Sequence, residues 1–285
     1  MSGVCSHGNR VVTLKSPSPV SGRMDLPDIG FGTYKLQGDD CVAAVETALE
    51  TGYRHVDTAQ MYENEAAVGE GIARSNVDRE DVFVATKVWR DRLGYGDFVE
   101  STYQSMDRLG VDTLDLLYVH WPLDTYDADE TLRALDALHN QGKIDHVGLS
   151  NFTPELLAEA RVKLDAPVYA HQVEMSPLCP QEELLAEANE NDTRLVAYSP
   201  IARGTVSDVP EVVAVAEEHD ITPAQAALAW LMAKDVVPIP KAGSPDHIRE
   251  NFAARDVDLS AADVERIDGV ERRERVVDFP EAPWN

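Results

Sequence analysis

Short apolar runs alternate with longer amphipathic segments along most of the chain. Eight of these runs predict β-strands, and they lie at residues 29–33, 53–57, 82–88, 114–120, 146–150, 168–172, 195–199 and 236–240. Between them, apolar residues recur at intervals of three and four, as in segments 39–52, 97–110 and 129–143. That spacing predicts helices, and each of these segments has a glycine near its end, where helices commonly stop.

The alternation of strand and helix predicts the fold class. It is typical of a parallel sheet, and eight repeats match a closed (β/α)8 TIM barrel better than an open sheet. The sequence GFGTYKLQG at 30–38 resembles a GxGxxG fingerprint only loosely, which argues against a doubly wound dinucleotide fold. We expect one barrel domain over residues 1–285, with short loops at its carboxyl face. Residues 1–24 are predicted to form an arm or partial hairpin at the barrel bottom, and residues 271–285 an irregular tail over a barrel face.

Charge narrows the range of partners. The chain has 51 Asp and Glu against 25 Lys and Arg, giving a formal net charge of −26. Such a surface repels phosphate backbones and anionic lipids, so neither nucleic acid nor a membrane is an expected partner. Only seven lysines occur among many scattered carboxylates, a composition similar to that of proteins from salt-in halophiles. We expect a monomer.

Cysteine usage and the N-terminus indicate the compartment. Cys5, Cys41 and Cys179 are odd in number and show no CxxC spacing, so neither a disulfide framework nor a zinc site is expected. No apolar run has the length of a signal peptide core or of a membrane span, which needs about 20 residues. These features predict a cytoplasmic protein, and no cluster of histidines or cysteines predicts a metal site.

Polar residues stand where the predicted strands end. In a (β/α)8 barrel, chemistry collects at the carboxyl ends of the strands. The residues there are Asp57, Lys87, His120, Ser150, Asn151, Gln172, Tyr198, Ser199 and Lys241, with Tyr62 in the loop after the second strand. Taken alone, Asp57 fits a helix N-cap, Lys87 a lysine reaching solvent, and His120 or Tyr62 an ordinary core residue. Their convergence at one mouth favours a functional site.

Four of these residues suit the reduction of a carbonyl group. A buried lysine beside Tyr62 would favour the phenolate, and Asp57 would keep Lys87 protonated. Together they would lower the pKa of Tyr62 from its reference value of about 10 towards the working pH, as suits a general acid. His120 would hydrogen-bond the carbonyl oxygen and orient it towards that acid. Such a site needs a source of hydride.

Five segments resemble motifs of the aldo-keto reductases. They are GYRHVDTAQMYENEAAVGEGI at 52–72, ATKVW at 85–89, LYVHWP at 117–122, VGLSNF at 147–152 and IPKAGSPDHIRENF at 239–252. The resemblance runs from about residue 24 to the tail. It implies NAD(P)H-dependent reduction of aldehydes or ketones by direct hydride transfer, with Tyr62 as proton donor, Lys87 and Asp57 tuning it, and His120 positioning the substrate.

The resemblance also implies a cofactor site. Ser150, Asn151 and Gln172 match positions that hold the nicotinamide carboxamide, and Tyr198 matches the aromatic residue that stacks on the nicotinamide. The remaining residues implied to contact the cofactor are Thr33, Tyr34, Ser199, Ile201, Lys241, Ser244, His247, Glu250 and Asn251, of which the last two match adenine contacts.

One departure from the family pattern concerns the choice of cofactor. NADPH-selective members usually have Lys-Ser after the eighth strand and an arginine further on, but here Ala242 follows Lys241 and His247 replaces the arginine. Neutral histidine cannot match the bidentate grip of arginine on a phosphate. Ser244 and the helix N-terminus after it still offer donors to an anion. Lys241 therefore favours NADP, and we also expect appreciable use of NAD.

The loops that shape the substrate pocket are short, as in prokaryotic 2,5-diketo-D-gluconate and methylglyoxal reductases, which the chain resembles. We expect small polar or sugar-derived carbonyl substrates, with Trp89 and Trp121 lining the pocket. Two alternatives stay open: an NADP-binding regulatory subunit with slow turnover, and a sugar-phosphate isomerase on a similar barrel. The intact group of Asp57, Tyr62, Lys87 and His120 argues against the regulatory subunit.

Overall fold

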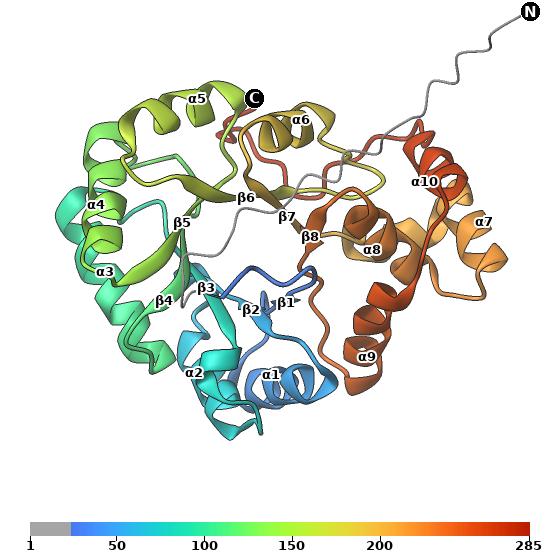
Figure 1. Ribbon diagram of the computed structural model, residues 1–285, viewed down its shortest axis with the longest axis horizontal. Coiled ribbons are helices and arrows are strands. Elements are labelled where there is room, and N and C mark those ends of the chain that lie inside the picture. The colour runs from blue at the N-terminus through green and yellow to red at the C-terminus, as the bar shows by residue number, and fades with distance from the viewer. Residues whose placement is uncertain (1–23) are drawn as a thin grey trace, which may run out of the picture.

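Eight parallel strands form the centre of the molecule in the computed structural model, which describes residues 24–285 (Figure 1). The strands are β1 (Phe31–Gly32), β2 (His55–Asp57), β3 (Phe83–Val88), β4 (Leu114–Val119), β5 (Ile144–Ser150), β6 (Val168–Glu174), β7 (Arg194–Tyr198) and β8 (Val236–Pro238). They pair in chain order, and all pairs are parallel. Gly30 N donates to Pro238 O at 2.9 Å and Gly32 N to Pro240 O at 3.1 Å, so backbone bonds also join β1 to β8. The predicted TIM barrel is confirmed.

Helices surround the strands, as Figure 1 shows. They are α1 (Gly38–Thr51), α2 (Glu65–Arg74), α3 (Tyr95–Leu109), α4 (Ala128–Asn140), α5 (Pro154–Lys163), α6 (Glu182–Glu190), α7 (Pro210–Glu218), α8 (Pro223–Ala233), α9 (Pro245–Ala253) and α10 (Ala261–Asp268). Four short 3-10 turns are η1 (Gln60–Tyr62), η2 (Arg79–Asp81), η3 (Ala202–Asp208) and η4 (Ala254–Asp256). The expectation of one helix per strand was too simple, because two α-helices follow β7 and two follow β8.

Glycines end two of the predicted helices for a conformational reason. Gly52 after α1 and Gly110 after α3 have φ angles of 127° and 69°. Residues with a Cβ rarely adopt these angles, whereas glycine adopts them readily. The sequence signal for both helix ends is therefore confirmed.

Side-chain alternation along the strands carries polar groups to the carboxyl face. On β3, Phe83 and Ala85 belong to the apolar cluster inside the barrel, and Lys87 is the next residue of the same row. On β6, Ala170 belongs to that cluster and Gln172 follows it. Because side chains alternate faces with a period of two, each row starts apolar and ends polar at the mouth. A second, larger apolar cluster packs the outside of the sheet against the helices.

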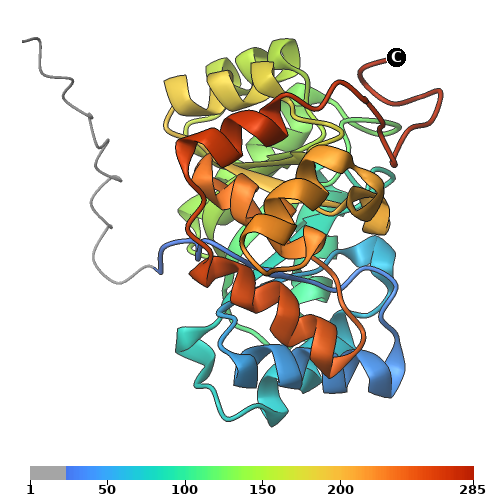
Figure 2. The ribbon, with the colours of Figure 1, turned by 90° about the vertical axis from the view of Figure 1, so that its right-hand side faces the viewer.

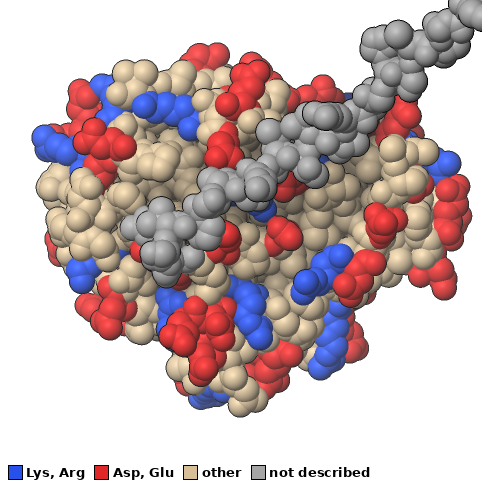
Figure 3. Space-filling view, in the orientation of Figure 1, with Lys and Arg blue, Asp and Glu red and all other residues tan. Residues whose placement is uncertain are grey.

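The last residues form no helix or strand. Figure 2 shows them in red, leaving α10 and crossing to the right-hand side of that view, where the C-terminus lies. The predicted N-terminal arm spans residues 1–24 and, apart from Met24, lies outside the described residues. Figure 3 shows carboxylates and basic groups interspersed on one face, without a continuous basic patch there. Within residues 24–285, no helix is long and apolar enough to cross a membrane.

Candidate active site

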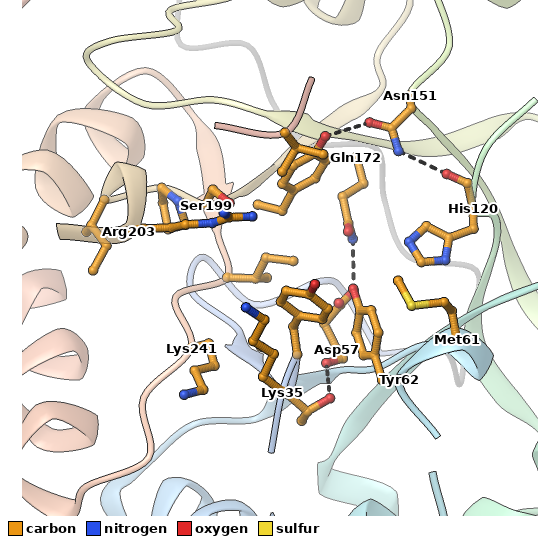
Figure 4. Close-up of a pocket in the computed structure, with 18 of the residues that line it drawn as sticks. Lys35, Asp57, Met61, Tyr62, His120, Asn151, Gln172, Ser199, Arg203 and Lys241 are labelled. Atoms are coloured by element: carbon orange, nitrogen blue, oxygen red, sulfur yellow. Dashed lines mark hydrogen bonds between the residues drawn. The ribbon is translucent and has the colours of Figure 1, made fainter. Parts of the chain in front are cut away.

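A cavity of about 490 Å³ opens at the carboxyl ends of the strands (Figure 4). Twelve of the residues expected to act in catalysis or binding line it: Thr33, Tyr34, Asp57, Tyr62, His120, Trp121, Asn151, Gln172, Tyr198, Ser199, Ile201 and Lys241. They come from loops and strand ends as far apart in the chain as Thr33 and Lys241. The structure therefore brings most of the predicted site into one hollow.

A buried ion pair forms the floor of this site. Lys87 Nζ lies 2.5 Å from Asp57 Oδ1 and 2.7 Å from Thr58 O, and its side chain is 0% exposed. The second carboxylate oxygen of Asp57 accepts a hydrogen bond from Gln172 Nε2 at 2.8 Å. Burial lowers the pKa of Lys87, and the charge of Asp57 opposes that shift. These contacts exclude the two alternatives, in which Asp57 was a helix N-cap and Lys87 reached the solvent.

Tyr62 lies above this pair, in η1. Lys87 Nζ is 5.1 Å from the centroid of the Tyr62 ring, but the ammonium donates its bonds to Asp57 and Thr58. Burial raises the pKa of Tyr62 well above its usual value, and the negative charge of Asp57 adds to this rise. The expected lowering of this pKa is therefore wrong for this structure, because burial and the negative charge of Asp57 together raise it. Tyr62 therefore keeps its proton at neutral pH.

His120 faces the cavity beside Tyr62, with 5.9 Å between the two ring centroids. Burial lowers the pKa of His120 well below its usual value, and Lys87 adds to this shift, so the ring is neutral. Within residues 24–285, its Nδ1 is buried without a hydrogen-bond partner. Trp89 packs against this ring at 5.0 Å but is not among the residues that line the cavity. Trp89 therefore contacts His120 but does not line this cavity, which differs from the expectation.

Asn151 connects three strand ends through its side-chain amide. Its Nδ2 donates to His120 O at 2.9 Å and to Ser150 Oγ at 3.0 Å, and its Oδ1 accepts from Tyr198 Oη at 2.9 Å. Asn151 and Ser199 have φ angles of 62° and 49°, in the left-handed region. Strained backbone of this kind is often found at functional sites. Ser150 is buried behind Asn151 and does not line the cavity.

Comparison with known proteins decides the family. A model described as the aldo/keto reductase family matches residues 28–272. The chain belongs to the aldo/keto reductase family. It is therefore an oxidoreductase, and carbonyl reduction is its class of reaction.

Relatives of this aldo/keto reductase carry reductase names. A glyoxal reductase of Bacillus subtilis is 35% identical over 271 residues, which cover 94% of this chain and 98% of the relative. Methylglyoxal reductase DkgB of Escherichia coli O157:H7 is 34% identical over 257 residues, covering 89% and 96%. Among solved structures, a putative 2,5-diketo-D-gluconic acid reductase B is 36% identical with a TM-score of 0.87, covering 90% of this chain and 92% of that one.

The segment after β8 of this aldo/keto reductase forms an exposed rim. Lys241 reaches the cavity, whereas Ser244 and His247 do not line it. Ser244 is the N-cap of α9, and its hydroxyl oxygen accepts from His247 N at 3.3 Å. Glu250 is tied to Thr222, whose Oγ1 donates to its carboxylate at 2.7 Å. Asn251 is buried in the same helix. These residues share α9 and its N-terminus, outside the cavity itself.

Eight further residues line the cavity without having been predicted: Gly32, Lys35, Met61, Pro200, Arg203, Gly204, Ile239 and Val277. Lys35 and Arg203 follow the predicted strands 29–33 and 195–199 by two and four residues, and their φ angles of 65° and 55° lie in the left-handed region. Both could have been predicted from the sequence, because each is a basic residue close to the carboxyl end of a predicted strand. Val277 had none, because it comes from the irregular tail.

Asn64 holds the loops around Tyr62 together, and sequence analysis missed it as well. Its Nδ2 donates to Thr33 O and Leu36 O, both at 2.9 Å, and its Oδ1 accepts from Thr58 Oγ1 at 2.9 Å. The side chain is buried, so these bonds are protected from competition with water. Asn64 thereby fixes the loop after β1 against the turn that carries Tyr62.

Proposed function

We propose that this protein reduces small aldehydes and ketones with NADPH, and also with NADH, using Tyr62 as proton donor. One observation carries the proposal. Tyr62 and His120 meet in the cavity above the buried Lys87–Asp57 pair, where a carbonyl oxygen can reach both side chains. Packing of the core alone does not explain why a buried ion pair, a neutral histidine and a tyrosine come together at an open cavity.

The residues around the cavity fit a nicotinamide dinucleotide. Lys35, Arg203 and Lys241 line it and are exposed, although the chain as a whole carries a net charge of −26. In Figure 4 these cations lie to the left of Tyr62 and His120. Local positive charge at one end of a cavity suits the phosphates of a dinucleotide. At the other end, the ring of Tyr198 and the amides of Asn151 and Gln172 offer a stacking surface and hydrogen bonds to a nicotinamide.

A bound reduced nicotinamide supplies the hydride. The protein's own residues then act on the carbonyl oxygen. His120, neutral because of its burial, donates a hydrogen bond that orients this oxygen. Tyr62 transfers its phenolic proton to the oxygen as negative charge develops there, and its raised pKa keeps that proton available at neutral pH. Lys87 compensates the phenolate that remains, across 5.1 Å to the Tyr62 ring.

The proposed substrates are small carbonyl compounds such as methylglyoxal, glyoxal and sugar-derived aldehydes. The names of the methylglyoxal and glyoxal reductases among the relatives support this class. So does the size of the cavity, about 490 Å³, which the dinucleotide must share with the substrate. Beside His120, the walls formed by Met61, Trp121 and Val277 are apolar, which favours compact substrates with few charges.

The test compares the wild-type protein with Tyr62→Phe. Reduction of methylglyoxal, phenylglyoxal and glyceraldehyde should proceed with NADPH in the wild type and fall by about 10³-fold in the variant, the scale of a general acid's contribution. Cofactor binding, followed by quenching of tryptophan fluorescence, should stay within about twofold, since the ring is kept. Undiminished turnover in Tyr62→Phe would refute the assignment. Slow turnover of every substrate by wild-type protein that binds NADPH tightly would instead favour a regulatory subunit.

A further inference from the structure

Glu174 occupies a position at the mouth that the proposed chemistry leaves unused. It is the last residue of β6 and belongs to the same inward row as Ala170 and Gln172, one step beyond Gln172 towards solvent. Its side chain is nevertheless almost fully buried. A buried carboxylate at the edge of an active site needs partners, because an unpaired buried charge is costly.

The partners of Glu174 are backbone groups of the C-terminal tail. Its Oε1 accepts from Val276 N at 2.6 Å and its Oε2 from Val277 N at 2.8 Å. Burial raises the pKa of Glu174, whereas these two bonds and the nearby Arg275 and Arg203 oppose the rise. Two residues before Val276, Glu274 N also donates to Leu178 O at 2.9 Å, so the carboxylate of Glu174 extends a backbone attachment of the tail. Tail backbone is thereby fixed to the end of a barrel strand.

The fixed segment is part of the cavity wall. Val277 lines the cavity, and Phe279, two residues further on, packs against Trp121 with ring centroids 4.9 Å apart. Trp284 contacts the same indole at 5.5 Å. The tail therefore closes the cavity beside Trp121, on the side of His120. Glu174 is not among the residues that line the cavity, although it is paired with Tyr198 of β7, which does line it, so we expect its carboxylate to act mainly through the tail.

We propose that Glu174 is a specificity-determining positioning residue, whose carboxylate clamps Val276 and Val277 so that the tail excludes bulky carbonyl substrates. This inference rests on the proposed reductase function. If the clamp is released, Val277 and the aromatic residues behind it move away from Trp121 and the cavity widens at the substrate end. Compact substrates lose a contact, whereas larger ones gain space.

The experiment uses Glu174→Gln in the full chain, with Glu274→Gln as matched control. The glutamine keeps the shape of Glu174, but its NH2 group faces one of the two backbone N–H groups. Because an NH2 group cannot accept a hydrogen bond, that bond is lost. The side chain of Glu274 pairs with Arg272 on the surface and does not touch the clamp. Two quantities are measured: the rate of tryptic cleavage after Arg275, by mass spectrometry of the native protein, and the ratio of kcat/KM for phenylglyoxal to that for methylglyoxal.

In Glu174→Gln, both the cleavage rate and the substrate ratio should rise about tenfold, the scale of one lost hydrogen bond to a charged group. Both should stay at wild-type values in Glu274→Gln. Val277→Ala provides a second test of the wall: the ratio should rise while the cleavage rate stays unchanged, because the backbone bonds to Glu174 remain.

Three outcomes would overturn the clamp. These are an unchanged cleavage rate in Glu174→Gln, faster cleavage with an unchanged substrate ratio, and equal changes in the Glu274→Gln control. Failure of the proposed function looks different, because the wild-type protein would then reduce neither substrate. In that case the cleavage rates still measure how firmly the tail is attached, because they do not depend on turnover. The proposed role of Glu174 in substrate specificity would then be refuted together with the reductase function.

Discussion

The floor of the cavity and its rim after β8 obey different physical constraints. At the floor, Lys87 is fully buried, and both its charge and its position are set by Asp57 and Thr58. At the rim, Lys241 and His247 are exposed, and the hydroxyl of Ser244 caps the N-terminus of α9. A change at the floor breaks several contacts at once, whereas a change at the rim alters one. We therefore expect substitutions at the floor to impair folding and turnover, and substitutions at the rim to change mainly ligand preference.

Lys87→Met should produce the largest effect. It leaves Asp57 buried with Gln172 as its remaining side-chain partner, and breaking a buried ion pair in this way costs about 3–5 kcal/mol of stability. It also removes the positive charge proposed to compensate the Tyr62 phenolate, so we expect kcat/KM to fall about 10³-fold. Urea denaturation and steady-state kinetics with NADPH measure the two effects.

Lys234→Met is the control for that variant. Lys234 also forms an ion pair, with Asp268 at 2.7 Å, but it lies after α8, away from the cavity. We expect this pair to contribute no more than about 1 kcal/mol, because one partner is exposed. Wild-type kinetics in Lys234→Met and near-wild-type kinetics in Lys87→Met would together contradict the role given to the floor.

We also expect a pH dependence of stability from His55, which lies in β2 two residues before Asp57. Burial lowers the pKa of His55 to about 4, and within residues 24–285 both its ring nitrogens lack hydrogen-bond partners. Below the unfolded-state pKa of about 6.5, the unfolded chain binds a proton that the folded chain does not, so stability is lost as pH falls from about 6.5 towards 4. For this one group the loss reaches about 2 kcal/mol at pH 5.

His55→Phe tests this directly. The change in unfolding free energy between pH 7.5 and pH 5 should shrink by about 2 kcal/mol relative to wild type, as measured by urea denaturation. Equal pH dependence in wild type and His55→Phe would show that His55 charges freely in the folded protein.

The difference between the floor and the rest of the cavity also explains which features the sequence could predict. Apolar rows that end in Lys87, His120 or Gln172 follow from the period of two along a strand, so the barrel and most of the floor were predictable. The direction of the Tyr62 pKa shift was not, because it depends on how deeply the ring is buried and on which group Lys87 bonds. Val277 and Glu174 meet across about a hundred residues, and no local pattern encodes that contact.

At the rim, His247→Arg should change cofactor preference and little else. An arginine at the N-terminal turn of α9 offers a bidentate grip on the 2′-phosphate that distinguishes NADPH from NADH, next to the favourable end of the helix dipole. The ratio of kcat/KM for NADPH to that for NADH should rise about 10- to 100-fold, starting from a wild-type preference below about 1000-fold. His247→Lys should give a smaller gain, because an ammonium is a point charge without the planar fork. The kcat with saturating NADPH should stay at the wild-type value in both variants, since neither touches Lys87 or Tyr62. An unchanged cofactor ratio would remove His247 from the phosphate site, whereas a fall in kcat would show that rim and floor are coupled after all.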